Sequence, residues 1–272
     1  EMLRSLVGSE MCIRDRVWDA MVDIVVEQCE QDGLEPMSIN PVVGECNDSR
    51  INQIQKRVVG ADEVRQAFAS ASEEFEEGDV GAGAGTICYG LKGGIGSASR
   101  VIRIGEKEYT IGVLVQSNFG ATEDFVLNGE SVGAKILDWK QEKDDMAASE
   151  EDKGSIMSIL ATDLPLTSRQ LRRILRRTGV GIARTGGYTG HGSGEVMIGF
   201  TTANRIPSGA EEELLQIQAI PEHVINRAFL AAAEAEQEAI LNSMTAAERT
   251  RGQAGELYYS LSEYLEDQDS KQ

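Results

Sequence analysis

Apolar and polar residues along the chain follow two spacings, which predict helices in some segments and strands in others. The helical spacing covers residues 17–30, 62–71, 168–177 and 221–248. Compact apolar runs typical of strands cover residues 41–44, 109–116, 156–161 and 195–202. Because helices and strands do not alternate strictly, the pattern favours an α+β layered fold over a doubly wound parallel sheet.

Three glycine-dense blocks lie between these segments, at residues 81–85, 92–96 and 186–194. The first two fit neither G-x-G-x-x-G before a helix nor the phosphate loop G-x-x-x-x-G-K-[S/T]. Small and β-branched residues follow both blocks, which indicates strands and leaves no helix N-terminus to hold a pyrophosphate. The glycines therefore do not favour a nucleotide site.

The composition narrows the classes of partner. The 272 residues include 45 acidic and 26 basic side chains, which gives a formal net charge of −19. Nucleic acids and anionic membranes are bound through basic surfaces, so neither is an expected partner. No apolar run reaches the ~18 residues that a membrane-spanning helix needs. The four cysteines lack C-x-x-C spacing and only two histidines are present, so we expect no disulfide framework, no metal and no cofactor.

The predicted helix 168–177 carries five arginines: Arg169, Arg172, Arg173, Arg176 and Arg177. Such a helix is compatible with nucleic-acid binding, but a solvated face paired with nearby acids is more common in an acidic chain. The net charge favours the second interpretation.

Residues 1–16 (EMLRSLVGSEMCIRDR) have neither helical nor alternating periodicity and lack the layout of a signal peptide. Within them, SLVGSEMCIRDR resembles a translated sequencing-adapter read-through at the end of a gene fragment. We therefore expect a non-native leader over 1–16, with a natural disordered leader as the alternative. Residues 17–272 are expected to form one incomplete domain. The N-terminal residues do not indicate a cellular compartment, and we favour the cytoplasm.

The motif HGSGE at residues 191–195 is the main candidate for nucleophilic catalysis. A Ser-His-Asp triad is not favoured, because His191 and His223 are the only imidazoles and positions 191 and 195 break the G-x-S-x-G pattern. Another route needs no histidine: if the bond before Ser193 is cut, the freed α-amine becomes the base for its own hydroxyl. Its usual pKa of about 7.7–8.0 suits that role. Taken alone, the motif is more often a flexible turn.

Several blocks together resemble the self-processing aminopeptidases of the DmpA type, which include L-aminopeptidase/D-esterase/amidases and β-peptidyl aminopeptidases. The matching blocks are residues 41–48 (PVVGECND), 81–100 (GAGAGTICYGLKGGIGSASR), 109–120, 161–166, 170–186, 190–204 (GHGSGEVMIGFTTAN) and 231–248. They follow one another in family-like order from about residue 17 to 253, whereas the family chain begins well upstream.

The resemblance implies a four-layer αββα sandwich, similar to ornithine acetyltransferases and to N-terminal-nucleophile (Ntn) hydrolases. It also implies autocleavage between Gly192 and Ser193, which would give an α chain (17–192) and a β chain (193–272). Short peptides, amides or esters with a free amino terminus are the implied substrates. The processed pairs are expected to form homo-oligomers.

The resemblance also assigns roles to individual residues. Ser193 is the implied nucleophile, Asn118 the donor that stabilises the oxyanion, and Glu45 the acid that binds the substrate ammonium. Asn47 stands where the family often has a tyrosine that shapes the pocket. Glu234 is the candidate for a supporting carboxylate on the last long helix, although Glu234 and Glu238 at i,i+4 also suit a solvated acidic face.

Two alternatives belong to other functional classes. One is a catalytically inactive oligomeric relative, suggested by Asn47 and by the missing start. The other is an acyltransferase of the ornithine acetyltransferase type, which uses a threonine at the cut site, so Ser193 argues against it.

Overall fold

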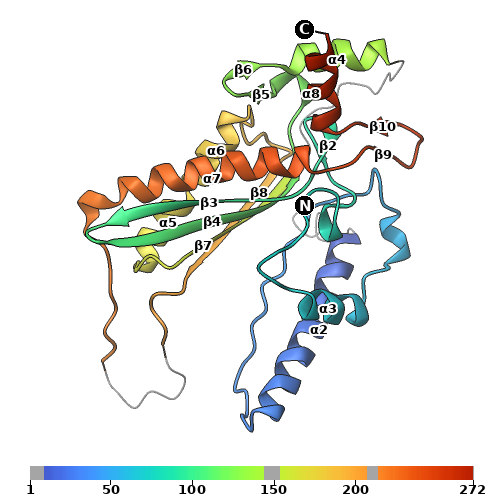
Figure 1. Cartoon of the computed structure of the whole chain (residues 1–272). Coiled ribbons are helices and arrows are strands. Elements are labelled where there is room, and N and C mark those ends of the chain that lie inside the picture. The colour runs from blue at the N-terminus through green and yellow to red at the C-terminus, as the bar shows by residue number, and fades with distance from the viewer. Residues whose placement is uncertain (1–8, 144–153, 207–213, 272) are drawn as a thin grey trace.

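The computed structural model describes residues 9–143, 154–206 and 214–271. A four-stranded sheet lies at its centre, with strand order β3-β4-β7-β8 (Figure 1). The strands are β3 (Gly94–Ile104), β4 (Lys107–Asn118), β7 (Ser155–Thr162) and β8 (Gly194–Thr201). β3, β4 and β7 pair antiparallel, whereas β8 joins β7 in parallel. The parallel pair needs a crossover connection, which explains why helices separate β7 from β8.

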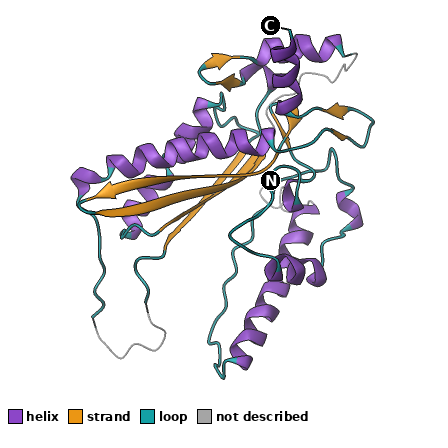
Figure 2. Cartoon of the chain, viewed as in Figure 1, coloured by secondary structure: helices purple, strands orange, loops and turns teal. Residues whose placement is uncertain are grey.

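One face of this sheet is covered by helices. The long helix α7 (Asn226–Thr245) lies along β3 and β4, as Figure 2 shows. The crossover helices are α5 (Ser168–Leu175) and α6 (Thr178–Arg184). α5 packs on β8 and α6 packs on α7, so these helices form one layer.

The remaining elements lie around the ends of the sheet. α2 (Ser9–Gln31) packs on α3 (Ala61–Ala69) through Ala20, Ile24 and Val64. α4 (Gly133–Glu142) and α8 (Leu261–Ser270) are joined by ion pairs between Lys143 and Asp267 and between Lys271 and Glu142. The short strand pairs are β1 (Ile87–Cys88) with β2 (Leu91–Lys92), β5 (Val126–Leu127) with β6 (Glu130–Ser131), and β9 (Thr250–Arg251) with β10 (Leu257–Tyr258). The single-turn helices are η1 (Ile54–Lys56), η2 (Gly81–Gly83), η3 (Thr122–Asp124) and η4 (Glu222–Val224).

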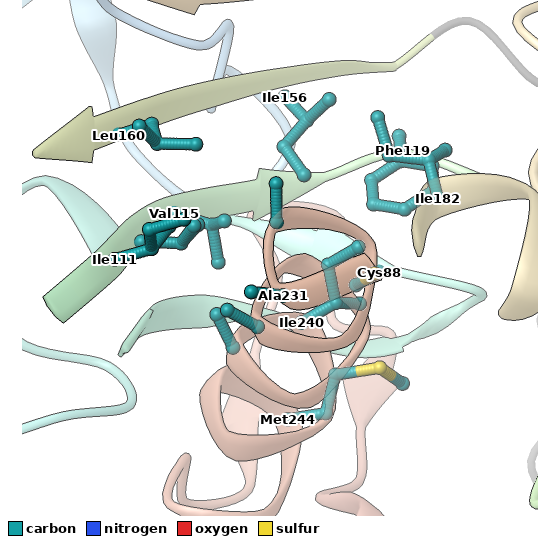
Figure 3. Close-up of a cluster of buried hydrophobic side chains, with 14 of the residues drawn as sticks. Cys88, Ile111, Val115, Phe119, Ile156, Leu160, Ile182, Ala231, Ile240 and Met244 are labelled. Carbon is teal, nitrogen blue, oxygen red and sulfur yellow. The ribbon is translucent and has the colours of Figure 1, made fainter. Parts of the chain in front are cut away.

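The core fills the space between α7 and the sheet. Buried side chains of β4 and β7 face buried residues of α7, among them Ile111, Leu160 and Ile240 (Figure 3). Small residues let the two layers approach closely. A Cβ on Gly96 of β3 would lie 2.1 Å from the Ala239 carbonyl oxygen of α7, so this position requires glycine.

A carboxyl group is buried in the same layer. Glu236 of α7 is fully buried, and its Oε2 accepts a 2.6 Å hydrogen bond from the Ser158 hydroxyl of β7. Its Oε1 has no hydrogen-bond partner among the described residues. Burial raises the pKa of Glu236 to about 7, although the Ser158 hydrogen bond opposes this shift. The side chain is therefore protonated over much of the acidic range.

The opposite face of the sheet is largely uncovered by the described residues. Val101, Val196 and Phe200 point to that side and keep 62%, 48% and 51% of their surface exposed. The described part of the chain therefore supplies one helical layer and one sheet layer of an α+β fold, which confirms the α+β class predicted from the sequence.

The boundaries of most periodic segments agree with the sequence predictions, but two N-terminal predictions need correction. The first helix begins at Ser9, so the part of the expected leader that the structure describes is helical; residues 1–8 lie outside the described residues. No residue between 9 and 31 is proline or glycine, so nothing interrupts that helix. Residues 41–44, predicted as a strand, pair with no strand among the described residues and belong to a loop.

The sequence patterns predict no helix after residue 248, but the structure contains one there, α8. The Ser260 hydroxyl accepts from the Glu263 amide and the Glu263 carboxylate accepts from the Ser260 amide, a capping box that starts the helix. Leu261 and Tyr264 are buried against the core, which anchors it.

The arginine-rich segment is paired and packed. Arg169 and Arg173 form ion pairs with Glu222. The guanidinium of Arg177 lies 3.9 Å from the centre of the Phe229 ring. These contacts confirm the interpretation of a face paired with acids. Within the described ranges, no helix has the length and apolar character needed to cross a membrane.

The buried carboxyl predicts a pH dependence of stability. Because the folded state binds the Glu236 proton more tightly than the unfolded state, this group lowers the free energy of unfolding as the pH rises from about 4.5 to 7. The loss is about 3 kcal/mol from the pKa difference. Urea unfolding at pH 5 and pH 8 should show this decrease in the natural chain and a smaller one in Glu236→Gln. Equal decreases in both proteins would contradict the assignment.

Candidate active site

Three strands end side by side at one edge of the sheet. Asn118 of β4 pairs with Ser155 of β7, and Ser155 pairs with Gly194 of β8. The Gly194 amide donates a 3.0 Å hydrogen bond to the Gly154 carbonyl. Since adjacent strands are about 4.8 Å apart, the backbones of Asn118 and Gly194 are separated by roughly 10 Å. The pairing register therefore brings Ser193 and Asn118 to the same end of the sheet.

Ser193 ends a tight turn before β8. Its amide donates to the Gly190 carbonyl at 3.0 Å, which closes the turn over residues 190–193. Gly192 is exposed and has no side chain of its own beside its carbonyl. Thr189 has φ of +54°, a left-handed conformation that is rare for a β-branched residue. The turn thus presents the Gly192–Ser193 bond at the surface, and the backbone just before the turn is strained at Thr189.

The Ser193 hydroxyl has a carboxylate partner. Its Oγ donates a 2.5 Å hydrogen bond to Oε1 of Glu195, two residues along the same chain. Ser193 directly precedes β8, and Glu195 is the second residue of that strand. Ser193 and Glu195 are both partly buried.

The Asn118 side chain ties two loops to the end of β4. Its Oδ1 accepts from the Ile87 amide at 2.9 Å, and its Nδ2 donates to the Asn47 carbonyl at 3.0 Å. An amide nitrogen carries two hydrogens, so one N–H is not used by these bonds. Asn118 is only 8% exposed, and its amide is held in a fixed orientation.

The segment that contains Glu45 crosses the same end of the sheet. The Cys46 thiol contacts the carbonyl oxygens of Gln116 and Ser155 at 3.7 and 3.6 Å. The Glu45 side chain is 15% exposed, and its Oε1 lies 3.4 Å from Nε of Arg14 in α2. The Glu45 carboxylate therefore already holds a cationic group.

The structure gives Asn47 a local role. Its Oδ1 accepts from the Ser49 amide at 3.0 Å, which stabilises the turn after Glu45, while its carbonyl accepts from Asn118. Asn47 thus connects the Glu45 segment to the oxyanion candidate through its backbone.

A buried lysine supports the loop next to Asn118. The Lys92 ammonium is fully buried and donates to the carbonyls of Gly83, Thr86 and Gly93 at 2.8, 3.1 and 2.7 Å. These contacts use all three of its hydrogens. Burial lowers the pKa of Lys92 to about 8, partly opposed by the charges of Asp79 and Asp48. Lys92 fixes the carbonyl of Thr86, directly before the amide that Asn118 binds.

The structure does not place Glu234 in contact with these residues, and its supporting role stays a prediction. Glu234 lies on α7 and pairs with Nε of Arg100 at 3.3 Å, while Glu238 pairs with the same guanidinium at 2.5 Å. Arg100 lies opposite Ile111, seven residues before Asn118, or about 24 Å along β4. Glu234 and Glu238 form the acidic face that their i,i+4 spacing also suggested.

The site therefore gathers Ser193, Gly192, Asn118, Glu45 and Asn47 at one end of the sheet. Sequence reasoning missed Glu195 and Lys92. Glu195 stands at the start of the predicted strand 195–202, two residues after Ser193, and the sequence alone does not show that its carboxylate turns back to the Ser193 hydroxyl. The contacts of Lys92 depend on how the glycine-rich loop folds back, and spacing alone does not reveal them.

The chain matches the family model described as peptidase family S58 over residues 6–258. Two curated relatives, both beta-peptidyl aminopeptidases named BapA, come from Sphingosinicella xenopeptidilytica and Sphingosinicella microcystinivorans. Each is 35% identical, over 244 and 224 residues, which cover 87% and 79% of this chain. The chain spans only 60% and 57% of the length of these curated relatives.

Solved structures match the fold. A Pyrococcus horikoshii protein superposes with a TM-score of 0.83 at 43% identity, covering 94% of this chain and 69% of that protein. The L-aminopeptidase D-Ala-esterase/amidase of Ochrobactrum anthropi, described as a variant of the Ntn hydrolase fold, gives a TM-score of 0.82 at 32% identity. That match covers 94% of this chain and 70% of the Ochrobactrum protein. These neighbours confirm the predicted α+β sandwich of the Ntn hydrolase type.

Proposed function

Because the chain belongs to peptidase family S58, we propose that it is a self-processing serine aminopeptidase or amidase. The observation that carries this proposal is the exposed Gly192–Ser193 bond, held in a turn at the sheet edge where Asn118 and the Glu45 segment also lie. The peptidase names of the relatives support it over an inactive relative or an acyltransferase.

In the proposed mechanism, cleavage after Gly192 produces a chain that begins at Ser193. The new α-amine accepts the proton of the Ser193 hydroxyl, and Oγ attacks the carbonyl of the first substrate residue. The amine then returns the proton to the leaving group as the substrate's C–N or C–O bond breaks, and water hydrolyses the ester left on Oγ, which releases the acid and restores the Ser193 hydroxyl. The products are chains of residues 17–192 and 193–272, with any leader before them.

Asn118 is the proposed oxyanion donor. Its amide is buried and held at two points, and one N–H is not used in those contacts. A preorganised donor stabilises the tetrahedral oxyanion without reorientation during the reaction.

Glu45 is the proposed site for the substrate ammonium, with Asn47 beside it in the pocket. The pairing of Glu45 with Arg14 supports this role, since it demonstrates that a cation reaches the carboxylate. A substrate must displace Arg14, which belongs to the helical part of the expected leader. Short peptides, amides or esters with a free amino terminus are the proposed substrates, and processed pairs are proposed to form homo-oligomers.

Replacing the nucleophile tests the processing. Ser193→Ala should remain one polypeptide on a denaturing gel and show no amidase activity, because it has no hydroxyl to attack the bond. Ser155→Ala, which changes the neighbouring serine of β7, should still be cut. A cleaved Ser193→Ala protein would refute self-processing by Ser193.

Blocking the substrate amine tests Glu45. N-acetylation of an amino-acid anilide should lower kcat/KM by about 100-fold, since it removes a buried charge pair worth about 3 kcal/mol. Glu45→Gln should narrow the difference between the two substrates. Equal rates for the free and acetylated anilides in the natural enzyme would exclude ammonium recognition.

Removing the amide tests the oxyanion role. Asn118→Ala should depress kcat about 100- to 1000-fold and change KM little, because the donor acts on the transition state. Gln116→Ala is the matched control. Gln116 lies two residues before Asn118 on the same strand, and its side-chain amide donates a comparable hydrogen bond to the Ala82 carbonyl. A similar fall in kcat for both variants would indicate a structural effect only.

A further inference from the structure

The first cleavage cannot use the base that serves the mature enzyme. In the uncut chain the nitrogen of Ser193 is an amide, and its hydrogen is donated to the Gly190 carbonyl. An amide nitrogen does not accept a proton at neutral pH, so the Ser193 hydroxyl needs another acceptor before it can attack. The self-processing step thus requires a group that the mature mechanism does not.

Glu195 is the group in position. Its Oε1 accepts the Ser193 hydroxyl at 2.5 Å, within the reach that proton transfer requires. A carboxylate is an acceptor when ionised and a donor once protonated, so one side chain can take the proton and give it back. His191, the nearest imidazole in sequence, is exposed, and no hydrogen bond joins it to Ser193 in the described part of the chain.

The backbone around the bond keeps this arrangement in place. On one side, the Gly194 amide is fixed to the Gly154 carbonyl at 3.0 Å, and Glu195 pairs with Ile156 in the parallel ladder. On the other side, the turn over 190–193 and the left-handed Thr189 bend the chain before the exposed Gly192. The hydroxyl and its acceptor are therefore anchored to β7, while the acyl side lies in a turn that can move.

We propose that Glu195 is a catalytic residue of chain cleavage, acting as the base and then the acid for the Ser193 hydroxyl. The inference rests on the proposed self-processing function, and it identifies the group that accepts the Ser193 proton during chain cleavage. After cleavage the α-amine of Ser193 takes over for substrate turnover.

The step is balanced as follows. The Ser193 hydroxyl proton passes to the Glu195 carboxylate while Oγ bonds to the Gly192 carbonyl carbon, forming a cyclic tetrahedral adduct. Protonated Glu195 then donates to the Ser193 nitrogen as the Gly192–Ser193 C–N bond breaks, leaving an ester and a free amine. Water hydrolyses that ester, which gives the Gly192 carboxylate and restores the Ser193 hydroxyl.

The experiment follows conversion of freshly made single chain into two chains by denaturing gel and intact mass. Glu195→Gln keeps the size of the side chain but removes the base, and it should slow conversion at least about 100-fold. Glu108→Gln changes an exposed carboxylate of β4 near the opposite end of the sheet; this variant is the control and should convert like the natural chain.

A chemical rescue separates catalysis from structure. Glu195→Ala should convert slowly, and added formate should accelerate it at least about 10-fold, because a small carboxylate can occupy the vacated space and act as the base. A structural defect would not respond to formate. Circular dichroism and thermal unfolding of both variants establish that they are folded.

Each outcome has a distinct meaning. If the natural chain and Glu195→Gln are cut at the same rate, the role of Glu195 is overturned and self-processing stands. Slow conversion of a folded Glu195→Ala without any response to formate also overturns it. A natural chain that never converts overturns both the processing and the role of Glu195.

Discussion

The register of the strand ladder is the constraint on which the candidate site depends. The pairings of Asn118 with Ser155 and of Ser155 with Gly194 end three strands at one line, and the hydrogen bond from the Gly194 amide to the Gly154 carbonyl fixes Ser193 there. A shift of one residue would turn each side chain of β8 to the other face of the sheet. Glu195, and Ser193 next to the strand, would then leave the face of the sheet on which they now lie.

Among the described residues, helices pack on one side of the sheet and hold that register. α7 packs closely on β3 and β4 because glycine and alanine meet at the interface, as at Gly96 and Ala239. A buried hydrogen bond from the Ser158 hydroxyl of β7 to the Glu236 carboxyl of α7 adds polar specificity to a largely apolar contact. The site residues lie where strands end and loops cross, so a rigid scaffold positions them and the turn over 190–193 remains free to rearrange.

Sequence reasoning succeeded where structure is local or periodic. The strands around 109–116 and 156–161 and the long helix over α7 follow directly from apolar spacing. It failed for residues 41–44, because a strand needs a partner that local sequence does not reveal. It missed α8 because its capping box, Ser260 with Glu263, lies in a stretch dominated by acidic residues.

For the site, the resemblance named residues that the fold does gather, namely Ser193, Asn118, Glu45 and Asn47. The supporting role that the resemblance gave Glu234 stays a prediction, since in the structure this carboxylate pairs with Arg100, away from the strand ends. Lys92 was overlooked because its three carbonyl partners come from a loop that folds back on itself.

The central claim is that the Gly192–Ser193 bond is cut by the chain itself. Intact mass spectrometry combined with N-terminal sequencing of the purified natural chain tests it most directly. The account predicts two polypeptides, one ending at Gly192 and the other beginning with Ser-Gly-Glu. A single uncut polypeptide of 272 residues, or a new amino terminus at any other position, would contradict it.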